Sequence, residues 1–131
     1  KALYPKRTVI SFAGDGCFLM TGQELATAVQ YQLNVIIIVV NNNMYGTIRM
    51  HQEREYPARV YGTSLVNPNF AAFATAFGAH GELVETTEQF APALERALHA
   101  GKPALIEIRI DPEAITPNAT LQSIRQAAHK A

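Results

Sequence analysis

The 131-residue sequence has little of several features on which whole classes of protein depend. Its single cysteine, Cys17, excludes a disulfide within the chain and favours a cytoplasmic location. The 11 basic and 11 acidic residues cancel, so we expect no nucleic-acid partner. The longest aliphatic run, residues 35–40, is far shorter than the roughly 20 residues of a membrane span, so we expect no membrane partner either.

Charged residues are also scarce, at 17% of the chain against about 25% in an average domain. A compact chain with so little charge is expected to cover part of its surface with a partner. Tryptophan is absent altogether. Hydrophobic residues, in contrast, make up 48%, which excludes a disordered chain and supplies enough apolar surface for a buried core.

The apolar residues form an alternation of strand-like and helix-like segments. Strands are predicted at residues 8–13, 35–40, 79–84 and 104–110, and helices at residues 21–33, 67–78, 86–99 and 121–130. This order is typical of an α/β fold, a doubly wound and mostly parallel sheet with helices on both faces. The length suits a single domain, residues 1–131. Because the chain does not begin with Met, we expect it to be a piece of a longer protein.

Local signals give the expected helix boundaries. Thr21 and Glu24 have the spacing of a capping box, which predicts the start of the helix at 21–33. Asn67 followed by Pro68 predicts the next start, with Asn67 as the cap and Pro68 in the first turn. Pro92 lies within the helix predicted at 86–99, so the regular part of that helix is expected to begin near Pro92.

The segment between the second strand and Asn67 is the least regular part of the sequence. A short helix is predicted near the start of residues 44–57. Residues 49–59 are the most charged stretch, and Glu53, Arg54 and Glu55 are expected to form a solvated face.

Two polar clusters follow two of the predicted strands. Gly14-Asp15-Gly16 follows the first strand, Asn41-Asn42 follows the second, and 24 residues separate the clusters. This length fits one strand–helix–strand crossover, which would place Asp15 and Asn42 side by side at the carboxyl edge of the sheet. A carboxylate, an amide oxygen and a backbone carbonyl are ligands that suit Mg²⁺, and glycines allow a phosphate to approach the backbone. The residues therefore predict a diphosphate bound through Mg²⁺.

The two clusters and their surroundings resemble a known family. The pair GDG and NN, within the string GDGCFLMTGQELATAVQYQLNVIIIVVNNNMYGTIRMHQ, resembles the cofactor-binding motif of thiamine-diphosphate-dependent enzymes. The strings NPNFAAFATAFG and PALIEIRIDPE extend the likeness, which covers residue 7 to about residue 113. The chain is similar to the C-terminal cofactor domain of acetolactate-synthase-like and 2-oxo-acid decarboxylase enzymes, and the resemblance implies the thiamine-diphosphate-binding fold.

The resemblance also implies the site. Asp15, the side chain of Asn42 and the carbonyl of Met44 would ligate Mg²⁺. The residues lining the diphosphate would be Gly14, Gly16 and Cys17 on one side and Tyr45 and Gly46 on the other. The sequence departs from the family at Cys17, where Ser is common, and at Asn69, an expected helix-start residue where Asp is common. The string MYGTIRMHQ, without a nearby Trp, also differs from the one usual in acetolactate synthases.

The function implied is that of a cofactor-binding domain in a homo-oligomeric enzyme that decarboxylates or carboligates small 2-oxo acids. No catalytic residue is expected in this chain, because the glutamate that activates the cofactor lies in a separate pyrimidine-binding domain in this family. The chain alone is therefore expected to be inactive. Two alternatives are a 2-hydroxyacyl lyase on the same cofactor and a non-catalytic, flavodoxin-like module for a phosphate ligand or a partner protein. The Asn41-Asn42 pair argues against the module, because a generic phosphate loop does not need it.

Overall fold

The structure, a computed structural model, describes residues 1–129, and its internal contacts divide the chain into two compact units. The first, here called the sheet unit, comprises Lys1–Asn41 and Asn67–Arg109. The second, here called the helix-pair unit, comprises Asn42–Val66 and Ile110–Ala131. Within residues 1–129, no helix combines the length and the apolar character that crossing a membrane requires.

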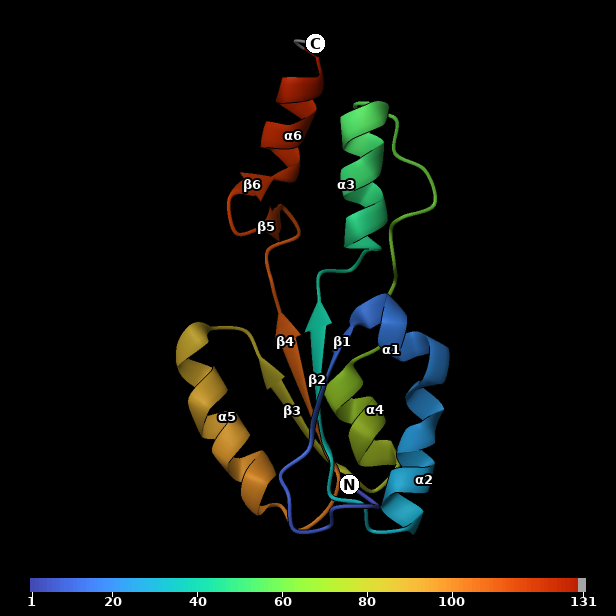
Figure 1. Ribbon diagram of the computed structural model, residues 1–131, viewed down its shortest axis with the longest axis vertical. Helices are drawn as coiled ribbons and strands as arrows, with labels where there is room; N and C mark the ends of the chain where they lie inside the picture. Colours follow the sequence, from blue (N-terminus) through green and yellow to red (C-terminus); the bar gives the residue numbers. More distant parts are fainter. Residues whose placement is uncertain (130–131) are drawn as a thin grey trace. The chain divides into compact units, whose positions relative to one another are not determined.

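The sheet unit is built around a parallel sheet of four strands in the order β1-β2-β4-β3 (Figure 1). Its elements, in chain order, are β1 (Ile10–Gly14), α1 (Asp15–Thr21), the 3₁₀ turn η1 (Gly22–Glu24), α2 (Leu25–Gln30), β2 (Ile36–Asn41), α4 (Phe70–Ala76), β3 (His80–Val84), α5 (Thr87–His99) and β4 (Ala104–Arg109). The four predicted strands are confirmed, with boundaries shifted by one or two residues.

Helices cover both faces of this sheet, as expected for a doubly wound fold. Figure 1 shows α5 on one side and α1, α2 and α4 on the other. Alternate residues of the central strands feed two separate cores, with Val39 and Leu105 on the α4 side and Ile38 and Ile106 on the α5 side. All four of these side chains are at most 1% exposed. The apolar run of β2 is thus explained by burial on two faces.

The first strand differs from the others because it lies at an edge. Phe12 is paired in register with Ile38 and therefore points to the α5 face. Helix α5 packs on β3 and β4, so within the sheet unit Phe12 remains 70% exposed while Ile38 is 1% exposed. The apolar residues 8–13 predict a strand buried on both faces, and for this face of β1 that prediction is wrong.

The predicted helix at 21–33 is also corrected. Helix α1 begins directly at Asp15, a 3₁₀ turn follows, and α2 ends at Gln30. The Thr21 side chain makes no capping hydrogen bond, since Thr21 is the last residue of α1. The capping-box spacing was therefore coincidental, and the helical segment starts as soon as β1 ends.

Two further helix starts differ from the sequence prediction. The cap of α4 is Asn69, whose side chain accepts a hydrogen bond from the Ala72 N–H at 2.8 Å, and not Asn67. Helix α5 is regular from Thr87, with Pro92 inside it. Its capping box, formed by Thr86 and Gln89, explains why the helix starts ahead of the proline.

The helix-pair unit contains α3, the hairpin strands β5 and β6, and α6. Their bounds are Gly46–Glu55 for α3, Ala114–Thr116 for β5, Ala119–Thr120 for β6 and Leu121–Ala128 for α6. Helix α3 confirms a helix within 44–57 but runs for ten residues. The last predicted helix is confirmed as α6; its expected end at residue 130 lies outside the described residues.

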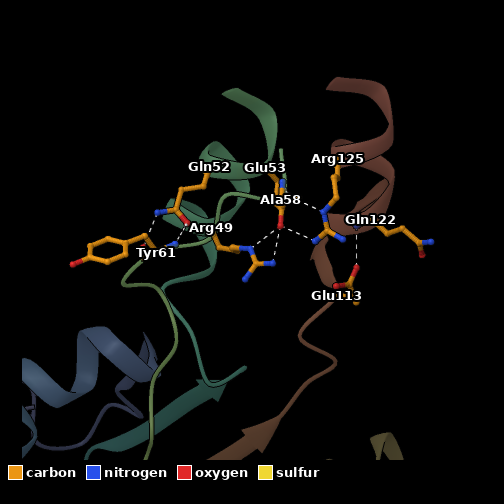
Figure 2. Close-up of polar contacts among 8 residues, drawn as sticks. All are labelled: Arg49, Gln52, Glu53, Ala58, Tyr61, Glu113, Gln122 and Arg125. Carbon is orange, nitrogen blue, oxygen red and sulfur yellow. Dashed lines mark hydrogen bonds and ion pairs between the residues drawn. The ribbon is translucent and has the colours of Figure 1, made fainter. Parts of the chain in front are cut away.

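Glu53 joins α3 to α6 and is the exception in the expected solvated face, because its neighbours Arg54 and Glu55 are exposed as predicted. Its side chain is 1% exposed, and its carboxylate accepts hydrogen bonds from Arg49 at 2.6 Å and Arg125 at 2.6 Å (Figure 2). The Ala58 N–H donates a further bond at 3.0 Å. The hydrogen bond from Arg125 is the largest cause that lowers the pKa of Glu53 from 4.5 to about 2, against the opposing effect of burial.

Candidate functional site

The carboxyl ends of β1 and β2 lie next to each other. The two strands are parallel neighbours, and Gly14 is paired in register with Val40. Asp15, the first residue after β1, is therefore close to Asn41, the last residue of β2. This arrangement follows from the crossover that the sequence predicted, and it is where ligands bind in doubly wound folds.

Asp15 is buried and held by two donors. It is 3% exposed, its Oδ1 accepts a hydrogen bond from the Gly16 N–H at 2.9 Å, and its Oδ2 accepts one from Asn67 Nδ2 at 2.7 Å. Each carboxylate oxygen has two acceptor positions, so one direction on each oxygen remains available to a cation. The carboxylate is fixed in orientation before any ligand arrives.

A second buried carboxylate lies in the same network. Glu107, on β4, is 0% exposed and accepts hydrogen bonds from Asn41 Nδ2 at 2.8 Å and from the Phe70 N–H at 2.9 Å. Asn41 Oδ1 in turn accepts a bond from Asn67 Nδ2 at 2.8 Å. Neither Asn67 nor Glu107 is among the site residues that the sequence predicted. The available signal was a carboxylate in the apolar run of residues 104–110, where burial demands a partner.

The remaining residues expected to bind the metal belong to the helix-pair unit. Asn42 is half-buried, and its Oδ1 accepts a hydrogen bond from the Met44 N–H at 3.2 Å. Met44 forms an isolated antiparallel bridge with Ser64, and the Tyr45 N–H donates to the Thr63 carbonyl at 2.8 Å. These contacts fix the backbone that presents the Met44 carbonyl and leave the Tyr45 side chain 42% exposed.

Gly46 packs closely against the side chain of Asn42. A Cβ atom at this position would lie 2.8 Å from Asn42 Nδ2 and 2.9 Å from Ile115 Cδ1. Both distances are shorter than real Cβ contacts, so any side chain at Gly46 would displace Asn42 or Ile115. Asn42 can therefore keep its observed position only because residue 46 has no side chain.

The glycines at the junction of β1 and α1 are the other part of the expected phosphate site. Gly14 has open space around it, since the nearest atom to an added Cβ is Cys17 Sγ at 3.9 Å. Gly16 is buried, and Cys17 is exposed. The thiol lines a hollow of about 270 Å³ on the α1 and α2 side of β1, together with Ser11, Ala13 and Ile37. Because the thiol is exposed, it is accessible to reagents.

The donor set fits magnesium better than a transition metal. Within residues 1–129, no group of three or more His, Cys, Asp or Glu side chains is placed to hold a metal ion. Asp15 would then be the one charged protein ligand, with neutral oxygen atoms beside it. Mg²⁺ is commonly bound through one or two carboxylates and completes its shell with water and substrate phosphates.

A doubly wound sheet with a buried carboxylate and amides at the strand ends defines an α/β domain that binds a cofactor at that edge. Residues 1–108 match the family described as thiamine pyrophosphate enzyme, C-terminal TPP binding domain. The chain belongs to this family, as its two polar motifs predicted.

Known relatives agree with this assignment. The chain is 36% identical to the acetolactate synthase isozyme 2 large subunit of Escherichia coli over 108 residues, which are 82% of this chain and 20% of that protein. It is 35% identical to a 2-hydroxyacyl-CoA lyase of Oryza sativa subsp. japonica over 128 residues, 90% of this chain and 21% of that protein.

A solved structure extends the comparison to three dimensions. The thiamine diphosphate-dependent 4-hydroxybenzoylformate decarboxylase of Rhodococcus jostii RHA1 matches with a TM-score of 0.76 and 34% identity, covering 82% of this chain and 20% of that one. The chain thus spans about a fifth of the length of the relatives it matches.

Proposed function

We propose that this chain binds the diphosphate of thiamine diphosphate through Mg²⁺, in an enzyme that decarboxylates or carboligates small 2-oxo acids. The observation that carries the proposal is the Asp15 carboxylate, buried at the carboxyl end of β1 and oriented by Gly16 and Asn67. Burial of an anion in an apolar fold is costly unless a cation or donors compensate it. A bound Mg²⁺ would add to the compensation that the Gly16 and Asn67 donors already give.

In this proposal Asp15, the Asn42 side chain and the Met44 carbonyl are the protein ligands of Mg²⁺. The diphosphate is lined by Gly14, Gly16, Cys17, Tyr45 and Gly46. The lack of a side chain at Gly14, where an added Cβ would meet no atom nearer than 3.9 Å, and the close packing of Gly46 against Asn42 support these roles.

The bound cofactor would supply the carbanion chemistry of the reaction, since thiamine diphosphate acts as the electron sink. The contribution of this chain is to bind and orient. Asp15 would hold the metal, the glycines would line the diphosphate, and the reactive end of the cofactor would thereby be oriented. No residue of this chain is assigned a proton-transfer step, and the activating glutamate is placed in the pyrimidine-binding domain of the same enzyme.

The proposal includes that separate pyrimidine-binding domain as a partner, a homo-oligomer and a cytoplasmic location. The exposed Phe12 and the low charge of the chain support a covered surface. The single cysteine supports a reducing compartment.

A second candidate is a lyase that cleaves 2-hydroxyacyl groups on the same cofactor. Its support is the likeness to a 2-hydroxyacyl-CoA lyase over 90% of this chain. The two activities differ in product: a 2-oxo acid substrate releases CO₂ or a carboligation product, whereas a 2-hydroxyacyl substrate yields an aldehyde and a one-carbon acyl fragment. Incubation of the full-length enzyme with each substrate class distinguishes them.

The test of the cofactor proposal is calorimetric titration of the full-length protein with thiamine diphosphate, with and without Mg²⁺. We expect binding that disappears when EDTA removes the metal. Equal binding in EDTA would contradict the proposed site. The isolated chain, given saturating cofactor, Mg²⁺ and pyruvate, is expected to release no CO₂. Turnover on the order of 1 per second or faster would show that the catalytic groups are all present in it.

A further inference from the structure

Asp15 is connected to the buried centre of the sheet by an unbroken chain of side-chain hydrogen bonds, here called the relay, which runs through Asn67 and Asn41 to Glu107. Asn67 Nδ2 donates to Asp15 Oδ2 at 2.7 Å and to Asn41 Oδ1 at 2.8 Å. Asn41 Nδ2 donates to Glu107 Oε1 at 2.8 Å. The chain of bonds joins residues from β2, β4 and the segment before α4, all within the sheet unit.

Both ends of this chain are carboxylates, and this fixes how the amides are oriented. An ionised carboxylate only accepts hydrogen bonds, so Asn41 must turn its NH₂ group toward Glu107 and Asn67 must turn its NH₂ group toward Asp15. Asn41 then presents Oδ1 to Asn67, which is the arrangement observed. Each amide can satisfy its two neighbours in one orientation only.

Glu107 is itself held by several donors, so it cannot easily rotate to accommodate a change in Asn41. The Phe70 N–H donates to its Oε2 at 2.9 Å, and Arg109 Nε lies 3.5 Å from its Oε1. Its side chain is 0% exposed, so water cannot replace a lost partner. Because these donors restrict the Glu107 carboxylate, its position fixes the orientation of the Asn41 amide.

We propose that Glu107 is a positioning residue for the metal site and acts on Asp15 through the amides of Asn41 and Asn67. The inference rests on the proposed role of Asp15 as a Mg²⁺ ligand and adds a residue that this role does not require by itself. Glu107 does not touch the metal or the cofactor. Glu107 determines the orientation of the Asn41 and Asn67 amides. Asn67 in turn donates to Asp15 Oδ2 and so holds the carboxylate in the orientation that it needs to bind the cation.

The consequence of an altered Glu107 follows from the bond directions. In Glu107→Gln, the new NH₂ group must face either the Phe70 N–H or Asn41 Nδ2, which are both donors. If Asn41 turns over to accept from Gln, its NH₂ group faces Asn67, and Asn67 must turn over as well. The Asn67 oxygen then faces the Asp15 carboxylate and repels it. Removal of hydrogen-bond partners behind a metal ligand typically weakens metal binding about 10- to 100-fold.

The experiment measures Mg²⁺ affinity by calorimetry in the full-length protein with thiamine diphosphate present. The variants are Glu107→Gln, Asn67→Ala and the double variant, and thermal unfolding is recorded for each. The matched control is Glu82→Gln, because Glu82 lies on neighbouring β3, is paired in register with Ile106, and makes an ion pair with Arg96 at 2.5 Å outside the relay. This control loses a carboxylate and an ion pair from the same sheet.

We expect Mg²⁺ affinity to fall about 10- to 100-fold in Glu107→Gln and in Asn67→Ala, and to stay at the parent value in Glu82→Gln. The double variant should bind Mg²⁺ no more weakly than the single variant with the lower affinity, because both changes interrupt the same chain of hydrogen bonds. A purely structural role for Glu107 would lower the unfolding temperature, leave the affinity of the folded protein at the parent value, and so overturn the proposal. Additive losses in the double variant would also overturn it.

Other outcomes are equally decisive. If Glu107→Gln does not fold, Asn67→Ala still tests the relay, because Asn67 is only half-buried, and parent-like affinity there overturns it. Failure of the proposed function has a separate signature: the parent itself would bind thiamine diphosphate without Mg²⁺. That result would show that cofactor binding does not use Mg²⁺, and it would overturn both the proposed metal site and the role of Glu107 in it.

Discussion

Asn67 Nδ2 lies 2.7 Å from Asp15 Oδ2, although 52 residues separate them in the chain. The residue that the sequence assigned to a helix cap instead orients the proposed metal ligand. The helix is capped two residues later, by Asn69. Because Asn69 takes over the cap, Asn67 is available for the site.

Replacement of Asp15 by Ala is expected to abolish Mg²⁺-dependent binding of thiamine diphosphate in the full-length protein. The change removes the one charged ligand and leaves the metal facing neutral oxygens. Calorimetry with and without Mg²⁺ measures the effect, and circular dichroism checks the fold. Asp111→Ala is the matched control, because Asp111 is the other aspartate of the chain and is exposed. Parent-like binding in Asp15→Ala would contradict the assignment.

Replacement of Glu53 by Gln is expected to destabilise the contact between α3 and α6. The pKa of Glu53 is lowered to about 2, chiefly by Arg125, so its contribution is complete above pH 4.5 and declines as the pH falls toward 2. The shift corresponds to about 3 kcal/mol. Hydrogen exchange of the α6 amides in the full-length protein should be much faster in the variant at pH 7, and parent and variant should converge at lower pH.

The control for Glu53 is Glu55→Gln, on the same helix but exposed. Exposed substitutions of this kind usually change stability by no more than about 0.5 kcal/mol. Equal exchange rates in the parent and Glu53→Gln at pH 7 would show that the ion pair between Glu53 and Arg125 does not hold the two helices together.

Substitution of Gly46 by Ala is expected to displace Asn42 and weaken Mg²⁺-dependent cofactor binding. The added Cβ would also meet Ile115 Cδ1 at 2.9 Å. The second change Ile115→Val removes that carbon, so the double variant should regain stability while its cofactor binding stays weak. Ile115→Val alone serves as the control. If binding and stability recovered together, the clash with Asn42 at 2.8 Å would have no consequence for the site.

Substitution of Cys17 by Ser is expected to preserve or tighten cofactor binding. A hydroxyl donates to a charged phosphate oxygen more strongly than a thiol, and such bonds contribute roughly 1.5–3 kcal/mol. Because Cys17 is exposed, a bulky maleimide should label it in the native protein and weaken binding. Full affinity after complete labelling would place Cys17 away from the diphosphate.

The sequence predicted those parts of the fold that depend on neighbouring residues. The apolar runs marked the strands, and the length of the crossover brought Asp15 to the end of β2, because adjacent parallel strands end at the same edge. The contacts of Asn67 and Glu107 could not be predicted in this way. Those of Glu107 depend on β4 lying beside β2, a pairing that spans more than half of the chain and has no local pattern. Those of Asn67 depend on the segment before α4 returning to Asp15, 52 positions away in the chain.

The burial of Glu53 could not be predicted from neighbouring residues either. Its spacing from Arg49 is visible in the sequence and is typical of an exposed helical ion pair. The partner that buries it, Arg125, is 72 residues away. The charged stretch therefore predicts a solvated surface at Glu53, because only the packing of α3 against α6 distinguishes a buried carboxylate from an exposed one.

The strand order has a consequence for how the protein is made. Strand β4 is the last of its sheet in the chain, yet it lies between β2 and β3 and pairs with both. During synthesis, β3 therefore emerges from the ribosome before its partner exists, and the sheet can close only when residues 104–109 have followed. Glu107 arrives with that strand. The nascent chain thus completes its sheet and acquires the group that orders Asp15 in one late step, and a chain that stops before β4 has neither.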